Sequence, residues 1–232
     1  MQLNQLPLSQ FFQNYYSKFP TLTPIQEKSI NAGLLQNKSL LICAPTASGK
    51  TLVATMAICN ILGKGKAIYL VPLKALANEK YKEYQQLLKD TGYQVTLSTG
   101  EIDSESNYLA KYDLLILTTE KLDSLLRHRT PWLDQVQLII VDEIHLLNDP
   151  TRGPTLEIIL TLLKSLIKPQ IIGLSATIGN PKELAQWLEA DLVQDNWRPV
   201  ELKQGIISKA KPNFTENILK VLNVRTFRTL VS

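Results

Sequence analysis

A glycine, a lysine and a threonine stand in a row where a loop meets a segment of helical period. Gly49-Lys50-Thr51 follows the apolar run at 39–43, which gives a strand, a loop and a helix in succession. In this setting the backbone N–H groups of the loop and of the helix N-terminus face phosphate groups. Lys50 is expected to pair with the β- and γ-phosphates of a nucleotide, and the Thr51 hydroxyl to ligate Mg²⁺. The expected phosphate-binding residues are Ala44, Pro45, Thr46, Ala47, Ser48, Gly49, Lys50 and Thr51.

The loop departs from the common G-x-x-x-x-G-K-[ST] pattern at its first position, where Ala44 replaces glycine. Alanine is tolerated there if the backbone does not need a positive φ. The alternative interpretation is an ordinary glycine–lysine turn before a helix. The strand–loop–helix setting favours phosphate binding.

Two adjacent carboxylates, Asp142 and Glu143, follow the most apolar run of the chain, at 138–141. Buried carboxylates are costly unless a cation or a reaction uses them. Asp142 is suited to hold Mg²⁺, directly or through water. Glu143, on the other side of the strand, is suited to polarise an attacking water. His145 is expected beside them, and the alternative is a solvated strand end.

Two small hydroxyl residues follow the apolar run at 171–174. Ser175 and Thr177 are expected to hydrogen-bond to the acidic pair and to report whether a γ-phosphate is present. The alternative is a simple helix cap, by Thr177 or by Asn180 before Pro181.

The elements that must position these residues alternate regularly. Apolar runs without clean alternation predict strands buried on both faces of a parallel sheet. Segments of helical period lie between them, so the fold class is α/β, a mostly parallel doubly wound sheet with helices on both faces. Such sheets bind ligands at the carboxyl ends of their strands. The predicted strands are 39–43, 67–71, 95–98, 114–118, 138–141 and 171–174, and the predicted helices are 51–62, 75–89 and 154–167; after Trp187 the pattern thins.

Composition is that of an ordinary globular protein, with 44% hydrophobic and 20% charged residues among 232. A net charge of +4 neither demands nor excludes a polyanionic partner. Cys43 and Cys59 lack metal-ligand spacing, which indicates packing cysteines. Neither a signal peptide nor a membrane span is indicated, so a cytoplasmic protein with no membrane partner is expected.

With these motifs in place, residues 19–199 resemble superfamily-two helicases of the DExH kind. The resemblance implies a RecA-like P-loop domain that binds ATP and Mg²⁺, with domain bounds of 1–200. Residues 201–232 would be a linker and the start of a second motor domain, or a tail. Leu22-Thr23-Pro24-Ile25-Gln26 is similar to the adenine-recognition motif, which makes Gln26 the expected reader of the base.

Three further segments resemble the family's nucleic-acid motifs. They are Pro72-Leu73-Lys74-Ala75-Leu76-Ala77, Ser98-Thr99-Gly100 and Thr118-Thr119-Glu120-Lys121. In relatives such segments contact the phosphate backbone and grip a strand without reading bases. The candidate nucleic-acid contacts are Pro72, Lys74, Thr99, Gly100, Thr118, Thr119 and Arg152.

The residues around the Asp142-Glu143 pair narrow the resemblance to one group within this family. Asp142-Glu143-Ile144-His145, with Leu146-Leu147 and then Arg152-Gly153-Pro154-Thr155-Leu156-Glu157, is similar to archaeal fork-repair DNA helicases, the relatives of the helicase half of DNA polymerase theta. The resemblance implies an ATP-dependent 3'-5' DNA helicase acting on single-stranded or forked DNA in repair or recombination. The alternatives are an exosome-assisting RNA helicase and a nucleotide-binding module without turnover.

Motors of this family place ATP between two RecA-like domains, and the second supplies arginine fingers. No matching motif follows Pro199, so the second RecA-like domain is expected to be missing from this chain. An arginine finger contributes about 10³–10⁵ in rate in related enzymes. The isolated chain is therefore expected to hydrolyse ATP poorly.

Overall fold

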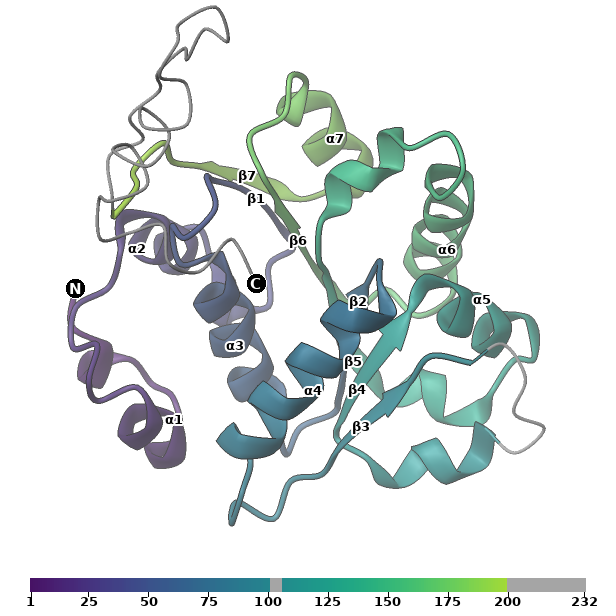
Figure 1. The fold of residues 1–232 in the computed structure, drawn as a ribbon, viewed down its shortest axis with the longest axis horizontal. Helices are drawn as coiled ribbons and strands as arrows, with labels where there is room; N and C mark the ends of the chain where they lie inside the picture. Colours follow the sequence, from purple (N-terminus) through teal and green to yellow (C-terminus); the bar gives the residue numbers. More distant parts are fainter. Residues whose placement is uncertain (101–105, 200–232) are drawn as a thin grey trace, which may run out of the picture. The chain divides into compact units, whose positions relative to one another are not determined.

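The computed structural model describes residues 1–100 and 106–199, and its centre is a seven-stranded sheet in which every pairing is parallel (Figure 1). The strand order is β3-β4-β2-β5-β6-β1-β7. The strands are β1 (Leu40–Cys43), β2 (Lys66–Val71), β3 (Val95–Ser98), β4 (Leu114–Thr118), β5 (Val136–Val141), β6 (Gln170–Ser175) and β7 (Asp191–Gln194). The α-helices of the described residues are α1 (Gln10–Tyr15), α2 (Pro24–Asn31), α3 (Lys50–Ile61), α4 (Lys74–Leu87), α5 (Thr119–Arg127), α6 (Gly153–Leu166) and α7 (Pro181–Leu188).

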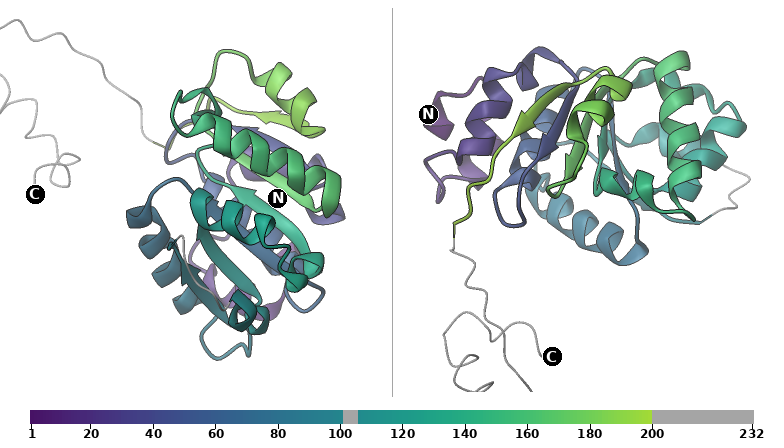
Figure 2. Two further views of the ribbon diagram at one scale, coloured as in Figure 1. Left: turned by 90° about the vertical axis from the view of Figure 1, so that its right-hand side faces the viewer. Right: turned by 90° about the horizontal axis from the view of Figure 1, so that it is seen from above.

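The inner strands are buried on both faces, which is why their sequences read as unbroken apolar runs. Alternate residues of β1 enter different cores: Leu40 and Ile42 pack with α1 to α4, whereas Leu41 and Cys43 pack with α5 to α7. Helices therefore cover both faces of the sheet, as the right-hand view of Figure 2 shows. The predicted doubly wound α/β fold is confirmed.

The six predicted strands are present within two residues of their expected bounds. The seventh, β7, was not predicted. It pairs with β1 at the sheet edge, and of its four residues only Val193 is buried. An edge strand with one buried side chain has no apolar run to reveal it. The three predicted helices correspond to α3, α4 and α6, each within two residues.

All seven strands run the same way, so their carboxyl ends lie along one edge of the sheet. The loops after β1, β2, β3, β4, β5 and β6 leave from this edge, and each carries one of the motifs named above. Met1–Pro199 forms one compact unit. The linker or domain start expected at 201–232 lies outside the described residues. Within the described ranges, none of the helices combines the length and apolarity needed to cross a membrane.

Candidate nucleotide and nucleic-acid site

The phosphate loop runs from the end of β1 to the start of α3. The Ala44 N–H donates to the carbonyl oxygen of Ser175 at 3.2 Å, which ties the loop to β6. Gly49 has a φ of 101° and Ala47 a φ of 64°, so the backbone turns left-handed twice within three residues. Ala44 itself does not have a positive φ. Its replacement of glycine therefore costs no backbone strain.

Lys50 is the first residue of α3, and its ammonium group folds back over the loop. Nζ donates to the carbonyl oxygens of Ala44 at 2.5 Å and Pro45 at 2.9 Å. Burial lowers the pKa of Lys50, and the nearby Glu143 and Asp142 carboxylates partly oppose that effect. The lysine and the acidic pair, 92 residues apart in the chain (142 − 50), therefore act on each other electrostatically.

Asp142 is held at the tip of β5 by three hydrogen bonds. Its N–H donates to the carbonyl oxygen of Leu70 at 2.9 Å. Its carboxylate accepts from the Glu143 N–H at 3.0 Å through Oδ1 and from the Tyr69 hydroxyl at 2.9 Å through Oδ2. The carboxylate is thus oriented by bonds within the chain itself.

Glu143 is placed differently from the sequence prediction. Strand β5 ends at Val141, so strand alternation does not direct this side chain. Instead Glu143 adopts a left-handed conformation with φ 50° and begins the short 3₁₀ turn Ile144–Asn148. Strained non-glycine residues of this kind cluster at functional sites. Its Oε2 lies 3.2 Å from Nδ1 of His145, and the Glu143 side chain is 44% exposed.

Ser175 ends β6, beside Cys43 of β1 in register. The residue is fully buried, and its hydroxyl has no hydrogen-bond partner within the described part of the chain. The expected bond from Ser175 to the acidic pair is therefore not made. Thr177 is exposed two residues beyond the strand, and Asn180 is the residue that precedes α7.

Gln26, the expected adenine reader, is 4% exposed and bonded within the chain. Its Oε1 accepts from the Thr23 N–H at 2.8 Å, and its Nε2 donates to the carbonyl oxygen of Gly49 at 3.1 Å. The Thr23 hydroxyl donates to the carbonyl oxygen of Ser48 at 2.9 Å. The start of α2 is therefore hydrogen-bonded to the phosphate loop through the side chains of Thr23 and Gln26, in addition to any contact with an adenine base.

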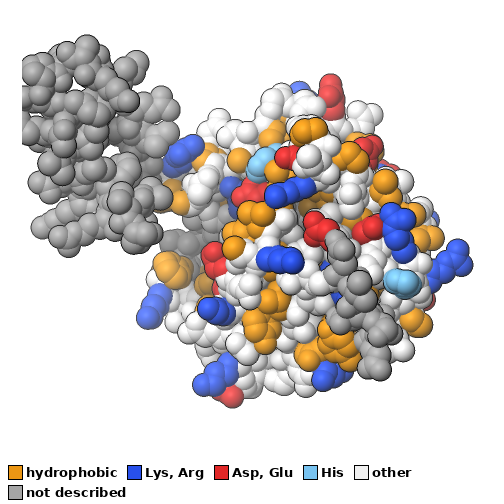
Figure 3. All heavy atoms as spheres, turned by 45° about the vertical axis from the view of Figure 1, so that its right-hand side comes forward, with side chains coloured by type: hydrophobic (Ala, Val, Ile, Leu, Met, Phe, Trp, Pro, Cys, Tyr) orange, Lys and Arg blue, Asp and Glu red, His pale blue; other side chains and the backbone are white. Residues whose placement is uncertain are grey.

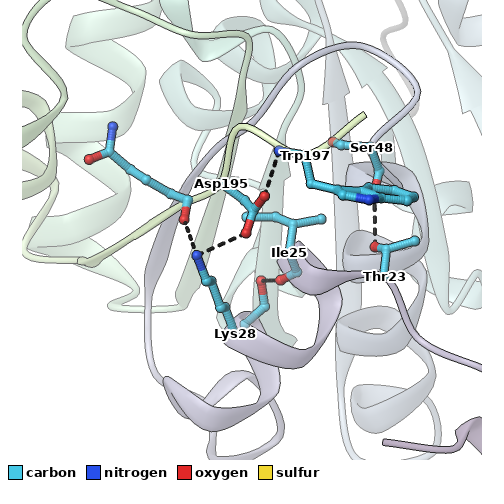
Figure 4. Close-up of polar contacts among 8 residues, drawn as sticks. Thr23, Ile25, Lys28, Ser48, Asp195 and Trp197 are labelled. Atoms are coloured by element: carbon cyan, nitrogen blue, oxygen red, sulfur yellow. Dashed lines mark hydrogen bonds and ion pairs between the residues drawn. The ribbon is translucent and has the colours of Figure 1, made fainter. Parts of the chain in front are cut away.

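A second anchor joins α2 to the segment after β7. Lys28 Nζ lies 2.8 Å from Oδ2 of Asp195 and donates to the Gln194 carbonyl oxygen at 3.0 Å. The Trp197 N–H donates to Oδ1 of Asp195 at 2.6 Å, so Lys28 and Trp197 meet at one carboxylate (Figure 4). The next residue, Arg198, is close enough to add to the lowering of the Lys50 pKa that burial causes.

Most of the candidate nucleic-acid residues line one cavity. Its volume is about 700 Å³, and it opens where the loops after β2, β3 and β4 meet. The candidates in its wall are Pro72, Lys74, Thr99, Gly100 and Thr118. Leu73 and Glu120 line it as well and were not chosen from the sequence, although both stand inside the quoted motifs.

Thr119 and Arg152 lie elsewhere, in the wall of a cavity of about 10 Å³ that Asp142 and Glu143 also line. Pro72 contributes to both cavities. The two candidates therefore adjoin the acidic pair, in a small cavity that shares Pro72 with the larger one. On the face drawn in Figure 3, cationic and anionic side chains of the described residues are interspersed rather than gathered by sign.

The donors suited to Mg²⁺ are oxygens. In the described ranges no group of three or more His, Cys, Asp or Glu side chains forms a metal cage. Mg²⁺ bound with a nucleotide needs only one or two protein oxygens, because phosphates and waters complete its octahedron. The oriented Asp142 carboxylate and the Thr51 hydroxyl fit that requirement.

Two contacts of the candidate site were missed from the sequence. Tyr69 stands in the middle of an apolar strand and carries no local signal of contact with Asp142. Thr23 stands inside the quoted adenine motif, but its bond to the phosphate loop spans 25 residues. Neither contact follows from spacing, because both depend on which strand and helix the sheet order brings together.

A parallel sheet with a phosphate loop after β1 and an acidic pair after β5 defines a nucleotide-binding P-loop domain. The family model for DEAD/DEAH box helicases matches residues 23–184, and the chain belongs to that family. It is 55% identical over 193 residues to an ATP-dependent DNA helicase Hel308 of Methanocaldococcus jannaschii, covering 80% of this chain and 16% of that protein. The Pyrococcus horikoshii protein of the same name is 52% identical over 187 residues, with 80% and 26% covered.

Solved structures agree with these relatives. The DUF1998 helicase MrfA bound to DNA superposes with a TM-score of 0.72 and 25% identity, over 82% of this chain and 30% of that chain. A complex of MrfA with DNA and AMPPNP gives 0.71 and 26%, over 82% and 29%. The chain therefore spans less than a third of the length of these relatives and structures.

Proposed function

We propose that this chain is the ATP-binding motor domain of an ATP-dependent DNA helicase that acts in repair or recombination. The observation that carries the proposal is the meeting of three motifs at one edge of the sheet. The phosphate loop is hydrogen-bonded to the end of β6, and the charges of the acidic pair after β5 act on the pKa of its lysine, Lys50. The cavity lined by the three nucleic-acid motifs opens along the same edge.

Each residue at the edge has a role that its chemistry supports. The loop N–H groups and Lys50, whose Nζ lies over the loop at the Ala44 and Pro45 carbonyls, bind the phosphates. Thr51 and Asp142 would hold Mg²⁺, which neutralises charge on the phosphates. Glu143, whose half-exposed side chain has Oε2 3.2 Å from Nδ1 of His145, orients and polarises the attacking water.

The nucleic acid is proposed to lie across the cavity of about 700 Å³, with its phosphates on Lys74 and on the backbone near Thr99 and Gly100. DNA is preferred over RNA because the relatives that share 45–55% identity are named as DNA helicases. The exosome-assisting RNA helicase is therefore the weaker alternative. Because the resemblance implies that a second RecA-like domain supplies arginine fingers, hydrolysis by this chain alone is expected to be slow.

Binding and turnover test the proposal separately. Affinity for a fluorescent ATP analogue with Mg²⁺ is measured first, and Lys50→Ala is expected to weaken it about ten- to a hundredfold, the worth of a charge-assisted hydrogen bond. ATP hydrolysis is then measured without nucleic acid, with single-stranded DNA and with single-stranded RNA. Equal nucleotide binding by the wild type and Lys50→Ala would refute the proposed phosphate site.

Two lysines near opposite ends of α4 provide a matched test of the nucleic-acid face. Lys74 begins the helix at the cavity, and Lys89 follows its far end, roughly 20 Å away at 1.5 Å per residue. Lys74→Ala is expected to weaken single-stranded DNA binding and to reduce its salt dependence by about 0.7 in the log–log slope. Lys89→Ala removes the same charge and is expected to change neither. Equal effects of the two variants would show that overall charge, not the cavity, attracts DNA.

A further inference from the structure

A tyrosine from the core of the sheet reaches the acidic pair. Tyr69 lies in the middle of β2, its side chain is 0% exposed, and it is one of the largest fully buried side chains of the described residues. Its hydroxyl donates to Oδ2 of Asp142 at 2.9 Å, across 73 residues of sequence.

The neighbouring tyrosine shows that burial alone does not require this contact. Tyr84 of α4 is also fully buried, and its ring centroid lies 5.7 Å from that of Tyr69. Its hydroxyl instead meets the Thr55 hydroxyl at 3.1 Å. A buried tyrosine needs some partner for its O–H, and neutral partners satisfy that need. Tyr69 is distinct because its partner is the carboxylate expected to face the metal.

We propose that Tyr69 is a positioning residue for Asp142, which rests on the function proposed above. The two carboxylate oxygens are held from different sides: Oδ1 by the Glu143 N–H and Oδ2 by Tyr69. Together these bonds fix the rotation of the carboxylate plane. Ligands held in this way bind metal more tightly, and removal of such a supporting group typically costs about 10–100-fold in metal affinity or activity.

The geometry also explains how the tyrosine keeps its place. Tyr69 stands on the strand next to β5, with Tyr69 opposite Ile140 in register, so its hydroxyl needs to extend only past the strand end to reach Asp142. Tyr84 packs against its ring and restricts tilting. The β2–β5 pairing thus places the Tyr69 hydroxyl where it holds one oxygen of the Asp142 carboxylate.

The test compares Tyr69→Phe with Tyr84→Phe in the full chain. Each variant removes one buried hydroxyl and leaves the ring, but only the first removes a bond to Asp142. Affinity for a non-hydrolysable fluorescent ATP analogue is measured over a Mg²⁺ titration and again in EDTA. Tyr69→Phe is expected to raise the Mg²⁺ concentration at half-maximal effect by about tenfold and to leave the affinity in EDTA unchanged. Tyr84→Phe is expected to change neither.

An unchanged Mg²⁺ midpoint in Tyr69→Phe would overturn the inference, as would an equal loss of affinity with and without Mg²⁺. A double variant guards against a general folding defect: in an Asp142→Ala background, Tyr69→Phe is expected to have no further effect on the Mg²⁺ midpoint. A further loss there would also overturn the inference. If the wild type itself shows no Mg²⁺-dependent binding and Lys50→Ala binds equally well, the proposed function fails, and the inference fails with it.

Discussion

Gly153 offers a sharp test of how α6 is joined to the acidic box. It is buried at the start of α6, and its N–H donates to the Asp149 carbonyl oxygen at 2.8 Å. A Cβ built at this position would lie 2.2 Å from the carbonyl oxygen of Leu147 and 2.9 Å from its carbonyl carbon. Leu147 belongs to the 3₁₀ turn that follows Glu143. Gly153→Ala would therefore push against the backbone of the turn that carries His145.

The size of the effect follows from the contact distances. Comfortable contacts lie at about 3.5–4.0 Å, so the two backbones must separate by roughly 1 Å. A carbonyl cannot swing aside like a side-chain end, so the upper part of the usual overpacking cost applies, about 3 kcal/mol. Alanine's gain over glycine within a helix is at most about 1 kcal/mol, so the clash wins. A net loss of about 2 kcal/mol lowers Tm by roughly 4–8 °C in a domain of this size.

Thermal unfolding of Gly153→Ala and of Gly179→Ala checks the reasoning. Gly179 has nothing within 4 Å of an added Cβ and no positive φ, so its substitution is expected to leave Tm nearly unchanged. Of these two variants, only Gly153→Ala should show slower ATP hydrolysis, because the displaced turn adjoins Glu143. A Tm for Gly153→Ala equal to that of the wild type would refute the claim that the turn and α6 are rigidly packed.

Three further outcomes are expected. Gly49→Ala should abolish nucleotide binding, because φ there is 101° and a Cβ would lie 2.3 Å from Nε2 of Gln26; binding at wild-type strength would contradict this. The Asp149 carboxylate accepts hydrogen bonds from the Thr151 side chain and backbone and from the Arg152 backbone, which lower its pKa to about 2. Since the folded pKa lies below the unfolded value, this stabilisation is present above about pH 4 and lost as pH falls toward 2; an NMR titration midpoint near 4 would disprove it. Burial raises the pKa of Cys43 to about 11 and of Cys59 to about 12, so neither should react with a thiol reagent at pH 8 in the folded protein, and rapid labelling would show local opening.

Some features of this protein are local in origin, and these could be predicted from the sequence. The inner strands are buried on both faces, so they read as unbroken apolar runs, and their order with the helices predicted a doubly wound sheet. The phosphate loop and the Asp142-Glu143 pair stand directly after such strands. Because the carboxyl ends of parallel strands share one edge, their meeting followed from the fold class. Edge strand β7, with only Val193 buried, had no comparable pattern.

Other features depended on the tertiary structure, since they join segments far apart in the chain. The order β2-β5 puts the Tyr69 hydroxyl on Asp142, and the docking of α2 turns Gln26 and Thr23 toward the phosphate loop. Strand β5 ends at Val141 and Glu143 adopts a left-handed conformation, so the Glu143 carboxylate does not lie on the strand, where the sequence placed it. Sequence pattern determined which residue types lie at the carboxyl ends of the strands, because burial and periodicity are local properties. Strand order and backbone conformation decided which atoms touch, because those contacts exist only once the sheet has formed.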